Sequence, residues 1–187
     1  RPGEMFSAAS MIKVAVMVAV HSGVRSGRFS LETPVRVKNH FPGIGAGSLR
    51  RSSPFDQDIH DAIGSTLTVG QLTESMVAGS SNLATNVLLE MIGLAEARRS
   101  CAGAGLQGIQ LSSGMGRGRR TGGNNVSAAG LEDLLSRLHD GTVISPEASQ
   151  RMLASLFAQR ISNGIPSGLP ASIRRTARIA HKTGNIV

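Results

Sequence analysis

Apolar and polar positions along the chain predict mostly helices, joined by loops that are rich in glycine, proline and serine. The segment from Ser10 to His21 is apolar on nearly every face, which is typical of a buried central helix. Residues 22–66 show no sustained period and predict irregular structure. Thr68 followed by Gln71 has the spacing of a capping box, so a second helix is expected to begin there and run through Val77.

Three further helices are predicted in the rest of the chain. The small residues at 78–81 break the second helix, and residues 82–93 predict a third that ends at its terminal glycine. Residues 126–141 and 145–160 have the spacing of amphipathic helices. The last of these has Ser145 as its N-cap and a proline in its first turn, which is a common way to begin a helix.

The remaining segments predict connections and one strand. Residues 114–125 are so rich in glycine and arginine that only a loop fits them, and residues 165–170 predict a turn-rich connection. Residues 177–184 alternate well enough to predict a β-strand. Neither an internal repeat nor a linker interrupts the chain, so residues 1–187 are expected to form a single domain or part of one.

Composition fits a packed core built without large aromatic side chains. The chain has 187 residues, 40% of them hydrophobic, with five Phe and neither Trp nor Tyr. The single Cys101 has no partner for an internal disulfide and is interpreted as a small buried hydrophobe. The apolar run from Met11 to Val20 is too short for a membrane span and is broken by Lys13, so we expect no membrane-spanning helix.

A formal net charge of +8 raises the question of a nucleic-acid partner. The arginines fall in scattered pairs, and no aromatic residues lie among them to stack on bases, so we expect a solvated basic surface and no nucleic-acid partner. A non-catalytic basic domain that binds nucleic acid or acidic surfaces stays as the third hypothesis. The five histidines are dispersed, and neither a metal site nor a cofactor is predicted.

Lys13 is the unusual feature of the first helix. Ser10 and Lys13 are three residues apart, so on a helix their side chains share a face and can touch. A lysine surrounded by Met11, Ile12 and Val14 is costly to charge, which lowers its pKa toward the range of a general base. Ser10 would then be an activated nucleophile. The structural alternative is a lysine that extends to solvent beside a serine that caps the helix.

Two further motifs follow in a fixed order: Ser80 to Asn82 between two predicted helices, and Lys182 to Gly184 at the end of the predicted strand. With the Ser-x-x-Lys motif at Ser10, this set resembles the class A β-lactamases and related penicillin-recognising serine hydrolases. The flanking sequences are similar to the family over nearly the whole chain. The resemblance implies an α+β fold of the β-lactamase/transpeptidase type: mostly the helical domain, with the nucleophile helix and one sheet strand, and with the flanking sheet strands missing.

The resemblance also implies roles for four catalytic residues. Ser10 is expected to be the nucleophile that becomes acylated, with Lys13 as its base or proton relay. Ser80 is expected to pass a proton to the leaving nitrogen, and Lys182 to assist Ser80 electrostatically.

Substrate binding is expected at four more positions, again by resemblance. Asn82 would hold a carbonyl of the substrate and contact Lys13, and Thr183 would bind the substrate carboxylate together with the motif lysine. The oxyanion hole would use the backbone N–H of the nucleophile and that of Asn185, just past Gly184. Such donors are worth about 3 kcal/mol each.

The chain departs from the family pattern in two places near these motifs. Ser81 replaces the usual aspartate in the middle of the second motif, which weakens the support of that loop. No Asp or Glu occurs from Ala97 to Leu131, where class A enzymes place the glutamate that activates the deacylating water. Gly116 and Arg117 lie near the expected place, and an arginine cannot accept a proton at working pH. Asn86 shares the helix face of Asn82, and its interpretation stays open between a site residue and a polar surface residue.

We therefore predict a serine hydrolase that opens β-lactam amides through an acyl-enzyme with slow deacylation. The alternatives are a penicillin-binding D-alanyl-D-alanine peptidase, an esterase or an acyl trap. The partner would be a small molecule, a β-lactam or a D-alanyl peptide-like amide, and the chain would be a monomer. Only nine residues precede Ser10 and three follow Gly184, so we expect a fragment that lacks strands of the family's sheet. The resemblance implies a periplasmic or secreted full-length protein, in antibiotic defence or cell-wall metabolism.

Overall fold

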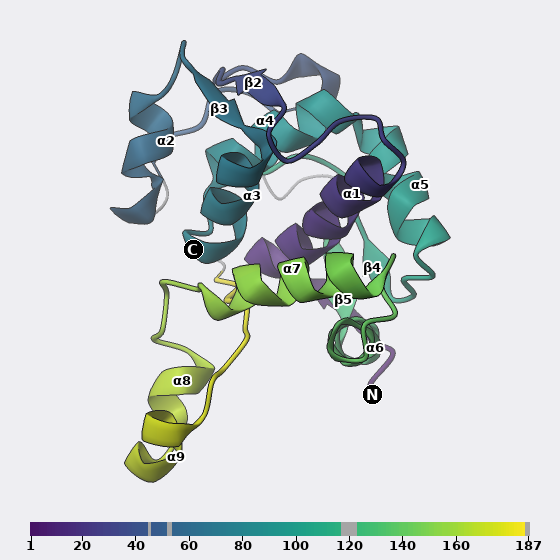
Figure 1. The fold of residues 1–187 in the computed structure, drawn as a ribbon, viewed down its shortest axis with the longest axis vertical. Coiled ribbons are helices and arrows are strands. Elements are labelled where there is room, and N and C mark those ends of the chain that lie inside the picture. Colours follow the sequence, from purple (N-terminus) through teal and green to yellow (C-terminus); the bar gives the residue numbers. More distant parts are fainter. Residues whose placement is uncertain (45, 52–53, 117–122, 186–187) are drawn as a thin grey trace.

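The structure, a computed structural model, describes residues 1–44, 46–51, 54–116 and 123–185 (Figure 1). In these ranges the α-helices are α1 (Lys13–Arg25), α2 (Gln57–Asp61), α3 (Val69–Ala78), α4 (Asn82–Ile92), α5 (Leu94–Gly103), α6 (Ala128–His139), α7 (Pro146–Phe157), α8 (Ile165–Gly168) and α9 (Ala171–Thr176). Short 3₁₀ helices are η1 (Ala9–Ile12), η2 (Pro42–Ile44) and η3 (Pro54–Asp56). The strands are β1 (Met5–Ser7), β2 (Pro34–Arg36), β3 (Thr66–Thr68), β4 (Ile109–Gln110) and β5 (Asn125–Ser127).

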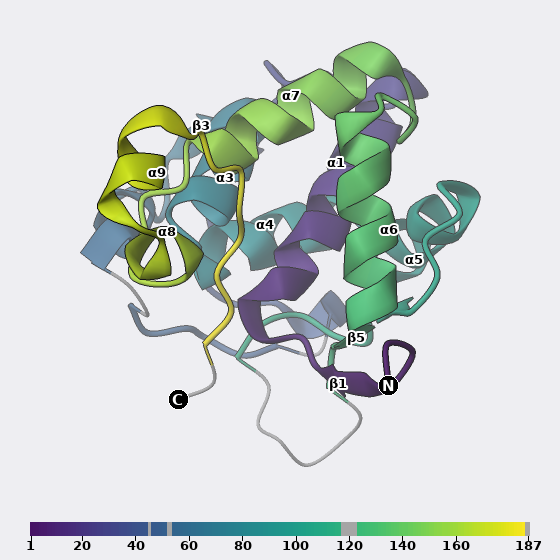
Figure 2. The same cartoon turned by 90° about the horizontal axis from the view of Figure 1, so that it is seen from below.

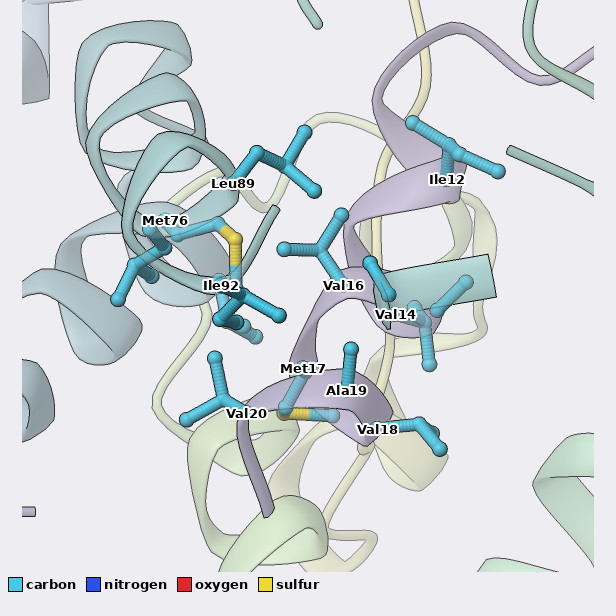
Figure 3. Close-up of a cluster of buried hydrophobic side chains, with 14 of the residues drawn as sticks. Ile12, Val14, Val16, Met17, Val18, Ala19, Val20, Met76, Leu89 and Ile92 are labelled. Carbon is cyan, nitrogen blue, oxygen red and sulfur yellow. The ribbon is translucent and has the colours of Figure 1, made fainter. Parts of the chain in front are cut away.

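Helix α1 is the centre of the hydrophobic core, as its sequence predicts. Every residue from Lys13 to Val20 is buried, and α1 packs against α3, α4, α5 and α7 (Figure 1). Side chains of α1 meet Met76 of α3 and Leu89 of α4 in this core (Figure 3). Burial on all sides fixes the axis and rotation of α1, because a close-packed helix cannot turn without opening voids. The polar groups at its N-terminal end are therefore held in place by the core.

The start of this helix differs from the prediction. Regular α-helix begins at Lys13, whereas Ser10 lies in the 3₁₀ turn η1 that leads into it. Ala9, just before Ser10, has a φ of 44°, in the left-handed region that side chains other than glycine rarely adopt. The chain thus enters the helix through a tight turn, with Ser10 in the 3₁₀ segment that precedes α1.

The predicted helix ends are confirmed where local chemistry sets them. Thr68 and Gln71 form both bonds of the capping box that begins α3. Ser145 caps α7 by accepting a hydrogen bond from the Ala148 N–H. Gly93 ends α4 with a φ of 85°, a conformation that glycine adopts without steric cost.

Other regular structure was not predicted. Helix α5 and the short helices α8 and α9 lie in segments where no helix was expected from the sequence pattern, and residues 22–66 contain β2, α2 and the end of α1. Strands β2 and β3 pair antiparallel with Val35 opposite Leu67. In the other sheet, β5 lies between β1 and β4, with Val126 opposite both Phe6 and Ile109. Strands of two or three residues are too short to show a period in the sequence.

The strand predicted at residues 177–184 is wrong. This segment forms no ladder with any strand that the structure describes, and it runs beside the first turn of α1 (Figure 2). Its backbone is held by the His181 N–H, which donates to the Leu156 carbonyl at 3.3 Å. Alternation of side chains indicates an extended backbone, but a strand also needs a neighbour with free N–H and C=O groups.

In the described part of the chain, no helix is long and apolar enough to cross a bilayer.

Candidate active site

Lys13 is the hub of the candidate site. Its side chain is fully buried, at 0% exposure, yet its ammonium nitrogen is surrounded by oxygen atoms. Lys13 Nζ donates to Ser10 Oγ at 3.0 Å and to Asn82 Oδ1 at 2.8 Å. It also reaches Ser80, at 2.5 Å from the backbone carbonyl and 3.2 Å from Oγ. The amine is therefore placed to exchange a proton with either serine hydroxyl.

Burial makes Lys13 an unusual lysine. Loss of hydration holds its pKa well below the ordinary value, and the positive charge of Lys182 lowers that pKa further. The carboxylate of Asp56 acts in the opposite sense and raises the pKa. A lysine kept from charging in this way can accept a proton, so Lys13 has the electrostatic setting of a general base.

Ser10 is presented to Lys13 by the turn η1. The turn is tied on its N-terminal side, because the Ala8 N–H donates to the Asn124 carbonyl at 2.9 Å. The Met11 N–H closes the turn onto the Ala8 carbonyl, also at 2.9 Å. Ser10 itself is half-buried, so its hydroxyl touches the buried amine while staying within reach of a ligand. A hydroxyl next to a base is the arrangement of an activated nucleophile.

Ser80 and Asn82 reach the same amine from the break between α3 and α4. Ser80 has a φ of 57°, a left-handed backbone that costs about 1–3 kcal/mol in a residue other than glycine. Ser81 then caps α4 by accepting from the Ala84 N–H at 3.0 Å, and its own N–H donates to the Ser75 carbonyl. This turn points the carbonyl and hydroxyl of Ser80 at Lys13, and the strain at Ser80 is typical of a functional site.

Lys182 approaches from the far end of the chain. Its Nζ donates to Ser80 Oγ at 2.8 Å and to the Thr183 carbonyl at 3.0 Å. Burial lowers the pKa of Lys182 to about 8. Ser80 Oγ thus lies between two amines, Lys13 and Lys182, which gives a short path along which a proton can pass.

Gly184 brings the end of this segment against the turn η1. A Cβ atom on Gly184 would lie 2.9 Å from Met11 Cγ and 3.2 Å from the Ala8 carbonyl oxygen. Only a residue without a side chain lets the two backbones approach so closely. Thr183 is half-buried next to Lys182, and Asn185 is exposed.

The structure thus brings five of the eight predicted residues into one hydrogen-bonded group, made of Ser10, Lys13, Ser80, Asn82 and Lys182. The backbone of Gly184 lies against the turn η1. Thr183 joins this group only through its backbone carbonyl, which accepts from Lys182 Nζ, and within the described residues Asn185 forms no hydrogen bond to the group. The predicted roles of both residues depend on a bound ligand. Arg117, which the sequence placed near the missing glutamate, lies outside the described residues.

Sequence reasoning left Asn86 open and missed Asp56. Asn86 is fully buried, so its interpretation as a surface residue is wrong. It holds the backbone of Met115 in both directions, accepting from the N–H at 2.7 Å and donating to the carbonyl at 3.1 Å. Asp56 is buried beside Ser81, in a segment that looks like an ordinary loop in the sequence. An aspartate in a loop gives no sign of burial, so only the fold identifies it.

Comparison with known proteins defines the class of this fold and site. The beta-lactamase enzyme family matches residues 1–187, so the chain belongs to that family. The helical α+β architecture is accordingly of the β-lactamase/transpeptidase type. Among curated proteins, none matches the chain.

Solved structures give the nearest detail. A β-lactamase from Sphaerobacter thermophilus shares 27% identity at a TM-score of 0.71, over 87% of this chain and 59% of that one. PBP-A shares 25% identity at a TM-score of 0.73, over 97% of this chain and 63% of that one. An ancestral class A β-lactamase, at 23% identity and a TM-score of 0.78, covers 98% of this chain and 68% of its own. The chain therefore spans less than two thirds of the length of the first two structures.

Proposed function

We propose that this chain has the acylation chemistry of a serine β-lactamase-like hydrolase, with Ser10 as the nucleophile. The observation that carries the proposal is the contact of a buried Lys13 with Ser10, Ser80 and Asn82 at one nitrogen atom. Membership of the beta-lactamase enzyme family supports it. So does a variant of PBP-A, at 26% identity, whose structure is an acyl-enzyme complex with penicillin G.

The first step is attack by Ser10 on the amide carbonyl of the substrate. Neutral Lys13 takes the hydroxyl proton as Oγ forms a bond to the carbonyl carbon. The negative charge that develops on the carbonyl oxygen would be stabilised by the backbone N–H groups of Ser10 and Asn185. The close approach of Gly184 to the turn at Ala8 favours this pairing, because it brings the second donor toward the first.

The second step breaks the carbon–nitrogen bond. The proton on Lys13 passes to Ser80 Oγ, and Ser80 gives its own proton to the leaving nitrogen, so that the product is an ester on Ser10 with the ring or peptide bond opened. Lys182, hydrogen-bonded to the same hydroxyl, favours the transient negative charge on Ser80. Lys182 and Thr183 would also bind the substrate carboxylate, and Asn82 a carbonyl of its side chain.

Hydrolysis of that ester is the step for which the chain has no obvious base. The segment from Ala97 to Leu131 contains neither Asp nor Glu. This gap favours a second candidate function, in which the same machinery serves a D-alanyl-D-alanine peptidase, an esterase or a slowly deacylating acyl trap. Both functions share the acylation step and differ in what releases the acyl group.

Turnover of a chromogenic cephalosporin distinguishes the two. We expect a burst of about one equivalent of product per active chain, followed by slow steady-state hydrolysis. Fast steady hydrolysis without a burst would contradict slow deacylation, and absence of both phases would contradict the proposed function. We further infer from the family that residues 1–187 are part of one β-lactamase-like catalytic domain without an internal boundary, and that the full-length protein is a monomer that is periplasmic or secreted.

A further inference from the structure

A buried carboxylate lies behind the turn that holds Lys13. Asp56, at the end of η3, has 0% exposure, and Ser81 Oγ donates a hydrogen bond to its Oδ1. On its other side, His60 Nε2 lies 3.4 Å from Asp56 Oδ2. A fully buried aspartate is costly unless it is hydrogen-bonded or paired, so its position between Ser81 and His60 calls for an explanation.

The contact with Ser81 links Asp56 to the geometry of the site. The Ser81 hydroxyl donates to Asp56 and at the same time accepts from the Ala84 N–H, so the carboxylate fixes the orientation that caps α4. Ser80 comes immediately before this cap and has the left-handed φ of 57°. Holding Ser81 therefore holds the Ser80 carbonyl and hydroxyl, the two atoms that contact Lys13.

Charge gives Asp56 a second effect. Two charged side chains act on Lys13 in the described structure: Lys182 lowers its pKa, and Asp56 raises it against the larger effect of burial. Asp56 itself faces Ser81 and His60. Removing the carboxylate would therefore remove the negative charge that offsets the effects of burial and of Lys182, and the pKa of Lys13 would fall.

We propose that Asp56 is a positioning residue, which holds the Ser80–Asn82 turn around Lys13 and supplies the negative charge that lets this amine take up a proton during acylation. The motif at this turn has a serine where an acid is usual, and here a carboxylate from η3 contacts that serine. The functional part of this inference rests on the proposed acylation by Ser10. The electrostatic part concerns Lys13 alone and can be measured without a substrate.

Titration of Lys13 tests the inference directly. The chain has three lysines, so protein labelled with ¹³C at the lysine ε-carbon gives three NMR signals, assigned with Lys38→Arg and Lys182→Arg. Asp56→Asn keeps an oxygen for Ser81 but removes the charge, and we expect the Lys13 midpoint to fall by about one pH unit. Asp58→Asn, at an exposed position on α2, is the matched control and should leave that midpoint unchanged. Equal Lys13 midpoints in the two variants would overturn the proposal.

The exchange of the two side chains is the second test. Asp56→Ser combined with Ser81→Asp returns a carboxylate and a hydroxyl to the same contact, so we expect the Lys13 midpoint to return to within about 0.3 pH unit of wild type. This double variant also decides the matter if Asp56→Asn does not fold. An exchange variant that folds with a Lys13 midpoint still lowered by a full unit would contradict the electrostatic role.

Labelling by a fluorescent penicillin connects Asp56 with function. If the wild type is labelled, Asp56→Asn should shift the acid limb of the labelling rate to lower pH and lower the maximum rate, because Lys13 loses its proton more readily while the turn is held less firmly. An unchanged profile would contradict the positioning role. If the wild type is not labelled, the proposed function fails, whereas the Lys13 titration still supports or overturns the effect of Asp56.

Discussion

Lys182 Nζ donates a hydrogen bond to Ser80 Oγ across 2.8 Å, although 102 positions separate the two residues in the chain. The same Ser80 hydroxyl lies 3.2 Å from Lys13 Nζ. One hydroxyl therefore joins the two amines, and through Lys13 it joins the motif that contains Ser10. Through this contact the C-terminal segment reaches the candidate site, although the segment pairs with no strand in the described structure.

The acylation rate should depend on pH in a bell shape, with each limb set by one lysine. The rate should rise with pH as Lys13 loses its proton, because only the neutral amine accepts one from Ser10. Above the pKa of Lys182, about 8, the charge that binds a substrate carboxylate is lost, and the rate should fall by about tenfold per pH unit. Stopped-flow labelling of wild type and Lys182→Arg checks this: the arginine stays charged, so its alkaline limb should be flat. A fall at the same pH in both proteins would assign that limb to another group.

Gly184→Ala should slow acylation by at least about tenfold. The new methyl group would lie 2.9 Å from Met11 Cγ and 3.2 Å from the Ala8 carbonyl oxygen, so the C-terminal segment must move away from Ser10. Gly164→Ala is the matched control, because its Cβ would meet only Thr183 Cγ2 at an ordinary 3.8 Å. The measurement is the second-order rate of penicillin labelling, and equal rates in both variants would show that the close approach does not matter.

A carboxylate placed on the loop held by Asn86 should restore deacylation. Met115 is the residue whose N–H and carbonyl both bind Asn86, one turn along α4 from Asn82. Met115→Glu places a carboxylate on this loop, and we expect it to shorten the acyl-enzyme lifetime by at least about tenfold. Met115→Gln has nearly the same size without the basicity and should not. Lifetimes are read from intact mass after removal of free penicillin, and equal lifetimes for the two variants would place the missing base elsewhere.

His21 should make the protein sensitive to acid. Burial, with the charge of Arg151, lowers its pKa from 6.5 to about 4, so the unfolded chain binds more protons than the folded one between these values. The contribution of His21 to the free energy of unfolding is therefore fully present above pH 6.5. It falls by about 3 kcal/mol as the pH falls toward 4. Urea unfolding at pH 7 and pH 4.5 should show that His21→Leu removes most of this loss. His139→Gln, at an exposed position, should retain it.

Local rules account for what the sequence predicted well. The contact between Ser10 and Lys13 follows from their spacing, and it survives the change from α-helix to a 3₁₀ turn because both conformations bring residues three apart together. The caps at Thr68 and Ser145 are formed within a single turn of chain. The two distant motifs could be placed beside Ser10 only through their resemblance to a family.

Three misses near the candidate site involve partners distant in sequence. The alternating segment that ends in Lys182 has the pattern of a strand, but its neighbours are a helix end and a turn. Asn86 on α4 has a polar side chain, but it is buried where it hydrogen-bonds to Met115, 29 residues later in the chain. In the sequence Asp56 likewise looks like an ordinary loop aspartate, because its contact with Ser81 forms only in the folded chain. Such contacts are set by packing of the whole chain, which single-sequence patterns do not encode.

Mass spectrometry of the chain after reaction with penicillin G tests the central claim most directly. We expect one adduct of the mass of penicillin G per active chain, located by peptide mapping on the peptide that contains Ser10. The adduct should be absent from Ser10→Ala and present in Ser7→Ala, which changes an exposed serine three residues earlier. An adduct that persists in Ser10→Ala, or a folded wild-type chain that forms none, would contradict the assignment of Ser10 as the nucleophile.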